Sequence, residues 1–208
     1  DHVFERRLVV GGLTQSGGIT KSMWEKALDE VRSNKLEVIS ILILGLGAGT
    51  AAEVIQKKWP DAKIVGVEID PVIIEVGKKY FAFNDIKNLN IINTNAITFV
   101  SKLVVSGDKF DVVVVDLYKG KNIEKKVQEE VFLQKIAQIL AKNGIVIFNV
   151  VAAQTSNFEA SVFLDKLDRI YKDYFCKRII SNDFFFCRPS PKEVILSMAK
   201  KSKKRKRR

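Results

Sequence analysis

The chain has 208 residues, a hydrophobic fraction of 47% and a net charge of +11 at pH 7, which suits one globular core with short appendages. It lacks the roughly 18–20 uninterrupted apolar residues of a membrane-spanning helix, so we expect a cytoplasmic protein that makes no membrane contact. A single histidine, His2, and two cysteines outside any metal-type spacing exclude histidine-dependent catalytic triads and His/Cys metal sites. The last nine residues carry eight of the positive charges, which leaves only +3 for the rest of the chain.

The elements follow in chain order from a short hairpin pattern, RRLVVGGLTQSGG, and a helix pattern, SMWEKALDEVRS. Apolar strand-like runs then alternate with helical periodicity. The expected strands cover residues 38–45, 63–69, 89–93, 110–116 and 144–151. The expected helices cover residues 51–59, 71–80, 96–105, 123–140 and 158–171, with Asn143-Gly144 as the stop signal of the fourth. CKRII and DFFFC, on either side of Ser181-Asn182, predict an antiparallel pair.

This alternation predicts an α/β fold with a mostly parallel, twisted sheet and helices on both faces. A C-terminal antiparallel hairpin on such a sheet is typical of the Rossmann-like class I methyltransferase fold. We therefore expect an N-terminal hairpin and helix extension over residues 1–38 and a nucleotide-binding domain over residues 39–189. Residues 190–208 are expected to form a C-terminal helix and a disordered basic tail.

The segment ILGLGAGT follows a buried strand and opens a helix. Gly45 and Gly47 allow a sharp turn and close approach of a ligand, and the amides from Gly49 to Ala51 can donate to an anionic group. A dinucleotide fingerprint would place its third small residue at position 50, where this chain has Thr50. The G-x-G-x-G spacing instead favours S-adenosylmethionine (SAM) or a close analogue, with a nicotinamide or flavin cofactor and a purely structural turn as alternatives.

Polar residues lie at or just after the ends of the next two expected strands. Glu68, 23 residues after Gly45, can accept hydrogen bonds from both hydroxyls of a ribose. Asp70, which precedes Pro71, is sufficiently explained as a helix N-cap. Asn95 and Ala96 lie where this fold contacts the adenine edge, although Asn95 is equally suited to capping the third helix.

LGLGAGTAAEVIQKKWPDAKIVGVEIDPVIIEVGKKYF and FDVVVVDLYKG closely resemble the spermidine synthase family of the class I SAM-methyltransferase superfamily. The resemblance covers about residues 39–150, with a fainter echo in VVGGLTQSGG. It implies polyamine biosynthesis, by transfer of an aminopropyl group from decarboxylated SAM to a diamine. By motif position, it implies that Asp116 is the catalytic carboxylate and that Gln15 reaches the ligand pocket.

The sequence departs from the family pattern three residues after Asp116, where Lys119 replaces a second carboxylate. Lys119 and Lys121 would repel a dication, although they could attract an anionic acceptor or lie in a solvated loop. Tyr118 could stack on adenine or substrate, or cover the sheet edge. The polyamine half of the site is therefore expected to be lost while the nucleotide half is kept.

The leading prediction is a SAM-dependent methyltransferase in which Gly45, Gly47 and Gly49 hold the amino-acid end of SAM and Asp116 acts as the base or orienter. The acceptor is expected to be a small molecule bound near Tyr118 and Lys119, and no metal is expected. The rival is aminopropyl transfer, with the missing carboxylate supplied by Glu124 or Asp183. A third reading is a non-catalytic adenosyl-ligand or nucleic-acid-binding protein that uses the basic tail. The sequence also allows a homodimer and, through the tail, weak nucleic-acid contact or a nuclear address.

Overall fold

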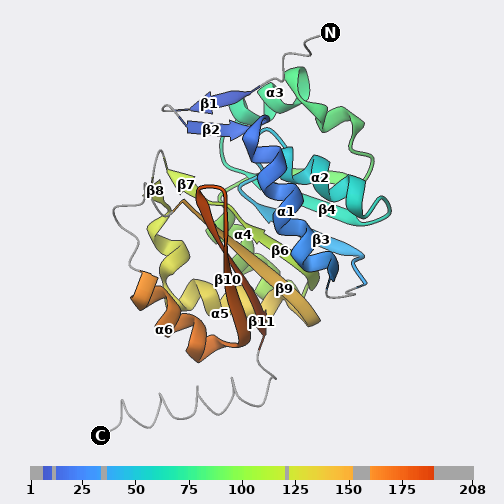
Figure 1. Cartoon of the computed structure of the whole chain (residues 1–208). Coiled ribbons are helices and arrows are strands. Elements are labelled where there is room, and N and C mark those ends of the chain that lie inside the picture. The colour runs from blue at the N-terminus through green and yellow to red at the C-terminus, as the bar shows by residue number, and fades with distance from the viewer. Residues whose placement is uncertain (1–6, 11–12, 34–36, 120–121, 152–159, 190–208) are drawn as a thin grey trace, which may run out of the picture.

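The structure is a computed structural model, and it describes residues 7–10, 13–33, 37–119, 122–151 and 160–189 (Figure 1). The strands are β1 (Leu8–Val10), β2 (Leu13–Ser16), β3 (Ser40–Leu44), β4 (Lys63–Glu68), β5 (Leu89–Asn93), β6 (Phe110–Val115), β7 (Tyr118–Lys119), β8 (Asn122–Ile123), β9 (Leu140–Val150), β10 (Tyr171–Ile179) and β11 (Asn182–Pro189). The α-helices are α1 (Ile19–Ser33), α2 (Thr50–Lys58), α3 (Pro71–Tyr80), α4 (Ala96–Ser106), α5 (Glu130–Ile139) and α6 (Ala160–Ile170). Two short 3₁₀ turns, η1 (Ala82–Asp85) and η2 (Lys125–Gln128), complete the described elements.

Seven strands form one sheet in the order β10-β11-β9-β6-β3-β4-β5. The pairs β3–β4, β3–β6, β4–β5 and β6–β9 are parallel, whereas β11 is antiparallel to both β9 and β10. The prediction of a mostly parallel sheet with a C-terminal antiparallel hairpin is confirmed. Strand order reverses beside β3, because the chain runs outward from β3 to β4 and β5 and later returns to β6 on the other side of β3.

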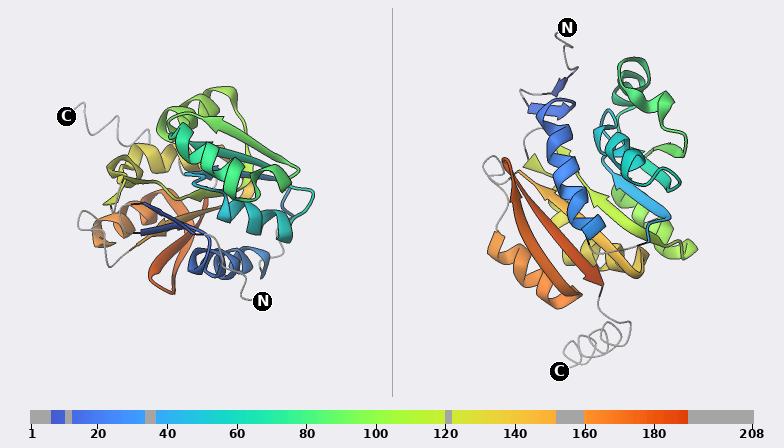
Figure 2. Two further views of the ribbon diagram at one scale, coloured as in Figure 1. Left: turned by 90° about the horizontal axis from the view of Figure 1, so that it is seen from above. Right: turned by 45° about the vertical axis from the view of Figure 1, so that its right-hand side comes forward.

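Helices cover both faces of the sheet (Figures 1 and 2). The buried side chains of α1, α2 and α3 pack in one apolar cluster with one face of the sheet. Those of α4, α5 and α6 pack in a second cluster on the other face. The central strands β3 and β6 are buried on both faces, which explains their uninterrupted apolar sequences.

The predicted helix over residues 123–140 is wrong at both ends. Ile123 belongs to β8, and α5 begins only at Glu130, after the η2 turn that Glu124 caps. β9 starts at Leu140, which pairs with Phe110 of β6, and the pairing then shifts to Ile145 opposite Val112. The turn residues near position 144 therefore mark a bulge inside a strand.

The expected C-terminal helix and the basic tail lie outside the described residues. Among the helices that the structure describes, none combines the length and apolarity that a membrane crossing requires.

Candidate functional site

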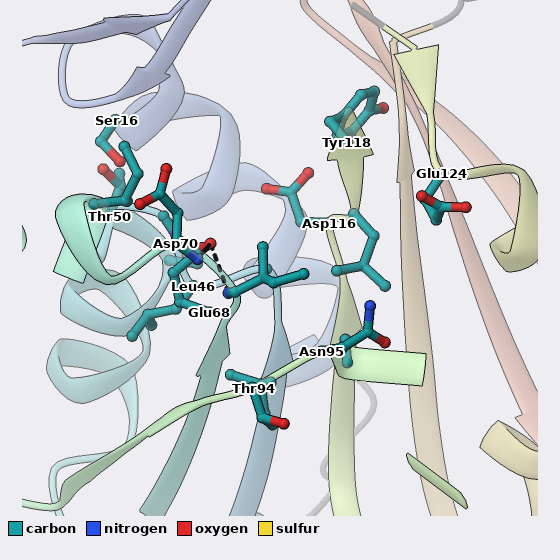
Figure 3. A pocket seen from close by; sticks show the side chains of 18 of the residues that line it. Ser16, Leu46, Thr50, Glu68, Asp70, Thr94, Asn95, Asp116, Tyr118 and Glu124 are labelled. Atoms are coloured by element: carbon teal, nitrogen blue, oxygen red, sulfur yellow. Dashed lines mark hydrogen bonds between the residues drawn. The ribbon is translucent and has the colours of Figure 1, made fainter. Parts of the chain in front are cut away.

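A cavity of about 360 Å³ opens at the carboxyl ends of β3, β4, β5 and β6 (Figure 3). It lies where the strand order reverses, which is the usual ligand position in open α/β sheets. Its volume is within the range of small-molecule sites. The N-terminal extension also lines it, through Leu8, Ser16 and Trp24. Trp24 packs edge-on against Phe184 and also borders the cavity.

The glycine loop between β3 and α2 requires glycine at specific positions. Gly45 has φ 88°, and a Cβ there would lie 2.2 Å from the backbone oxygen of Asp116. The backbone of the loop can therefore approach the end of β6 only without a side chain. Gly45 and Gly47 line the cavity. Gly49 does not line it; at φ 93° it packs against Phe83, whose Cε1 atom a Cβ would meet at 2.1 Å.

The backbone amides of the loop are mostly used within the protein. Gly47 N–H donates to Glu68 Oε2 (2.9 Å), Ala48 N–H to Ser16 Oγ (3.1 Å) and Gly49 N–H to the carbonyl of Leu46 (3.1 Å). The first-turn amides of α2 have no acceptor within the helix, and both Thr50 and Ala51 line the cavity. Of the amides expected to bind an anionic group, those of Thr50 and Ala51 at the start of α2 therefore remain, and that of Gly49 does not.

Thr50 has a role that its place in the glycine motif did not indicate. Its side chain is buried, and its hydroxyl accepts a hydrogen bond from Gly17 N–H at 2.9 Å. Together with the buried hydroxyl of Ser16, which accepts from Ala48 N–H, it joins the turn after β2 to the glycine loop. The N-terminal hairpin is thus fixed directly to the loop.

Glu68 ends β4 and lines the cavity. In addition to Gly47 N–H, its carboxylate accepts from the amides of Ile69 (2.8 Å) and Asp70 (3.0 Å). This half-buried carboxylate is therefore oriented by three backbone donors, which leaves one lone pair, on Oε2, for a ligand. Asp70 accepts from Val72 N–H at 2.8 Å as the N-cap of α3, as predicted, and also borders the cavity.

Asn95 and Ala96 line the cavity at the start of α4. Asn95 caps this helix, since its Oδ1 accepts from Ile97 N–H (2.9 Å) and Thr98 N–H (3.2 Å). Both lone pairs of that oxygen are then used, which leaves the Nδ2 donor for a ligand. An adenine ring would therefore offer Asn95 a ring nitrogen rather than its amino group.

Asp116 follows β6 beside the glycine loop and lines the cavity. Burial, opposed by a hydrogen bond from Asn149 Nδ2 (2.8 Å) and assisted by the negative charge of Glu68, raises the pKa of Asp116 to about 7. Such a carboxyl group can exchange a proton near neutral pH. Asn149 carries no motif in the sequence; only its place on β9 beside β6 identifies it.

Of the two residues expected to contact the substrate, the structure describes the side chain of Tyr118 but not that of Lys119. Tyr118 lines the cavity, and its hydroxyl donates to the carbonyl of Asn149 (2.9 Å) and accepts from Val151 N–H (2.7 Å). Burial raises the pKa of the Tyr118 phenol, so this group remains neutral and forms part of the wall. The backbones of Lys119 and Gln15 lie in β7 and β2, and their side chains fall outside the described residues.

Of the two substitutes considered for the missing carboxylate, Glu124 lines the cavity, whereas Asp183 forms an ion pair with Arg178. The lining thus contains four carboxylic side chains, those of Glu68, Asp70, Asp116 and Glu124. Among its described members there is no lysine or arginine. These carboxylic side chains would attract positively charged groups of a ligand. The described ranges hold no group of three His, Cys, Asp or Glu residues arranged to bind a metal ion.

Known proteins resemble the chain in sequence and fold. Residues 25–207 match the model of the spermine/spermidine synthase domain. A polyamine aminopropyltransferase of Vibrio vulnificus is 27% identical over 158 residues, which are 76% of this chain and 50% of that protein. An eEF1A lysine and N-terminal methyltransferase of Xenopus laevis is 26% identical over 168 residues, or 76% of this chain and 24% of that protein.

Two solved structures share the fold. Human methyltransferase-like protein 13, in complex with SAH, has a TM-score of 0.65 at 22% identity, covering 88% of this chain and 86% of that one. Spermidine synthase from Thermotoga maritima has a TM-score of 0.69 at 17% identity, covering 85% and 62%. The chain spans about half the length of the Vibrio relative and a quarter of the Xenopus one. Because the domain match covers most of its length, the chain belongs to the spermine/spermidine synthase domain family.

Proposed function

We propose that this domain binds SAM or decarboxylated SAM in the cavity and transfers a group from its sulfonium centre to an amine acceptor, with methyl transfer as the leading reaction. The observation that carries the proposal is the position of Asp116 in Figure 3. It lies between Glu68 and the glycine loop on one side and Tyr118 and Glu124 on the other. A donor held by the first group and an acceptor held by the second would meet at this carboxylate.

The proposed contacts of the donor come from the ends of β3, β4 and β5 in turn. We expect the α2 amides beyond Gly45 and Gly47 to hold the amino-acid end of the donor. Glu68 is expected to accept from the ribose hydroxyls, and Asn95 with Ala96 to contact the adenine edge. Gln15 remains a proposed contact of the donor, and Gly49 a support of the loop.

On the acceptor side, Asp116 is the proposed base or orienter. Bound SAM would supply an electrophilic methyl group, whose bond to sulfur breaks as the amine nitrogen attacks. Asp116 would orient the amine lone pair and take up the proton that the nitrogen loses. Its pKa of about 7 suits both tasks near neutral pH. Tyr118 would form the neutral wall of this half of the cavity, with Lys119 beside it in the chain.

The position of Glu124 in the cavity lining supports aminopropyl transfer as the second candidate. A second carboxylate on the acceptor side could hold the far ammonium group of a diamine, which Lys119 was expected to oppose. The relatives' names contain both acceptor types, polyamines and protein amines. Their common chemistry is an amine nitrogen, and we propose a small-molecule amine.

Calorimetric titration with SAM, decarboxylated SAM, methylthioadenosine and NAD tests the donor. We expect SAM to bind, and a clear preference for decarboxylated SAM would favour aminopropyl transfer. Binding of NAD without SAM would refute the proposal. Transfer assays with labelled donor should then lose activity in Asp116→Asn. The matched control, Asp111→Asn, changes a carboxylate on β6, the strand that Asp116 follows; Asp111 accepts from the backbone of Ser40 and does not line the cavity.

The remaining parts of the proposal concern the ends of the chain and its assembly. We retain residues 1–38 as an extension, 39–189 as the donor-binding domain and 190–208 as a basic tail. Cytoplasmic location, a homodimer and tail contact with nucleic acid are expectations. For the third reading, removal of residues 200–208 should abolish RNA or DNA binding at moderate salt and leave SAM binding unchanged. Nucleic-acid binding that survives this truncation would show that the tail is not the contact.

A further inference from the structure

A chain of side-chain hydrogen bonds leads from Asp116 into the sheet. Asn149 Nδ2 donates to Asp116 Oδ1 (2.8 Å), Asn182 Nδ2 donates to Asn149 Oδ1 (2.7 Å), and Ser181 Oγ donates to Asn182 Oδ1 (3.0 Å). Asn149 lies on β9, and Asn182 begins the neighbouring strand β11. The chain of bonds therefore crosses two strands behind the cavity.

Both asparagines are buried, with exposed fractions of 3% for Asn149 and 5% for Asn182. Phe184 lies opposite Asn149 in the register of β9 and β11 and packs edge-on against Trp24. Buried amides among aromatic side chains are costly unless they are hydrogen-bonded. Their conformations are therefore restricted to arrangements that keep the chain of bonds complete.

The direction of these bonds has a consequence for Asp116. Asn182 donates to the oxygen of the Asn149 amide, so the nitrogen of that amide must face Asp116. A carboxylate can accept this bond, and hydrogen bonding to the charged form favours ionisation. The opposite orientation would present an oxygen to Asp116 and would require a protonated carboxyl group.

The backbone before Asn182 shows an independent sign of constraint. The two residues between β10 and β11 are Ile180 and Ser181, and Ile180 has φ 59°. A β-branched residue rarely adopts this left-handed conformation. Such conformations persist where the surrounding structure determines them, often near functional sites. Here the turn delivers Asn182 into the buried chain of bonds.

We propose that Asn149 and Asn182 are positioning residues that act in series on Asp116, fixing the orientation of its carboxylate and stabilising the ionised form. Burial and the negative charge of Glu68, at the end of β4, oppose ionisation of this carboxyl group, and the bond donated by Asn149 counters them. Asp70 at the start of α3, Glu124 before η2 and the neutral phenol of Tyr118 also line the cavity. The proposal rests on the proposed function only in taking Asp116 as the base.

Carboxyl ¹³C NMR titration of protein labelled at aspartate tests this arrangement without any substrate. The Asp116 signal is assigned by its absence in Asp116→Asn. In Asn149→Leu, which removes the donor, we expect the pKa of Asp116 to rise by about one to two pH units. Asn182→Leu does not alter a group that touches Asp116, yet it should raise this pKa in the same direction, because the Asn149 amide is no longer held.

The matched control is Ile179→Val, a small deletion in a buried residue that pairs with Asn182 across the hairpin. It should leave the pKa of Asp116 unchanged while lowering stability slightly. An unchanged pKa in Asn182→Leu would overturn the serial arrangement, even if Asn149→Leu failed to fold. Calorimetry with SAM is a separate readout: loss of the proposed function would appear there, whereas failure of this inference would appear only in the titration.

Discussion

Gly45 offers the sharpest test of how the glycine loop is joined to the side of the cavity that holds Asp116. Its φ is 88°, and a Cβ would lie 2.2 Å from the backbone oxygen of Asp116. Gly107, at the end of α4, has a similar φ of 81°, but a Cβ there would meet no atom within 4 Å. Alanine at the two positions therefore imposes similar backbone strain, and only Gly45→Ala adds a steric conflict.

The expected magnitudes follow from these two terms. A left-handed alanine costs about 1–2 kcal/mol, so Gly107→Ala should lower the free energy of unfolding by that amount. Forcing atoms into a packed region typically costs a further 1–3 kcal/mol or so, which gives about 2–5 kcal/mol for Gly45→Ala. The conflict is with a backbone carbonyl, so relief requires movement of the chain at Asp116. SAM affinity should therefore fall at least about tenfold in Gly45→Ala, equivalent to about 1.4 kcal/mol, and stay unchanged in Gly107→Ala.

Urea unfolding of both variants, together with SAM calorimetry, measures these differences. The slope of the free energy with urea should stay constant, so that the midpoint reports stability. Equal losses of stability in the two variants, with normal SAM affinity in Gly45→Ala, would refute the close approach of the loop to the end of β6.

Other predictions address single interactions. Glu68→Ala should weaken SAM binding in calorimetry by about 1–3 kcal/mol, the range for a charged hydrogen bond; unchanged affinity would remove Glu68 as the ribose ligand. Asp116 has a pKa raised from 3.8 to about 7, so its contribution to stability is full below about pH 4 and is lost as the pH rises through 7. Urea unfolding should therefore show that the free energy of unfolding of Asp116→Asn, relative to that of the wild type, rises by at most about 4 kcal/mol between pH 4 and 8. If the difference in stability between the two proteins did not change with pH, the raised pKa would be contradicted. Ile180→Gly should raise Tm by up to about 2–4 °C, since glycine suits a left-handed residue in a two-residue hairpin loop; a lower Tm would argue against strain there.

The parallel core could be predicted from the sequence because its strands are buried on both faces. β3 and β6 are continuous apolar runs, a pattern that turn residues at each end make distinctive. The segment before β9 could not be predicted in the same way. Its apolar residues at helical spacing belong in turn to β8, η2, α5 and the start of β9, and only pairing with β6 decides where the helix ends.

The residues of the site likewise fall into those that could be predicted from the sequence and those that could not. Glu68 and Asp116 could be found because Glu68 ends a recognisable strand and Asp116 directly follows one, and the carboxyl ends of parallel strands share one edge of the sheet. Asn149 and Asn182 could not be found from the sequence, because nothing near them distinguishes members of a buried chain of hydrogen bonds from ordinary strand and turn residues. Their role depends on the order of β6, β9 and β11 in the sheet, which is a property of the assembled fold.

Thr50 shows that a useful sequence signal can have an unexpected physical basis. At the level of the motif, it distinguishes the loop from a dinucleotide fingerprint; in the structure, its hydroxyl accepts from Gly17 N–H. Ser16 makes the second connection, to Ala48 N–H, and lines the cavity. The N-terminal extension therefore closes one side of the cavity, and we expect its removal to open the cavity and to leave the Ala48 amide without its acceptor. The extension, which the sequence predicts to be separate from the nucleotide-binding domain, therefore forms part of the wall of this cavity.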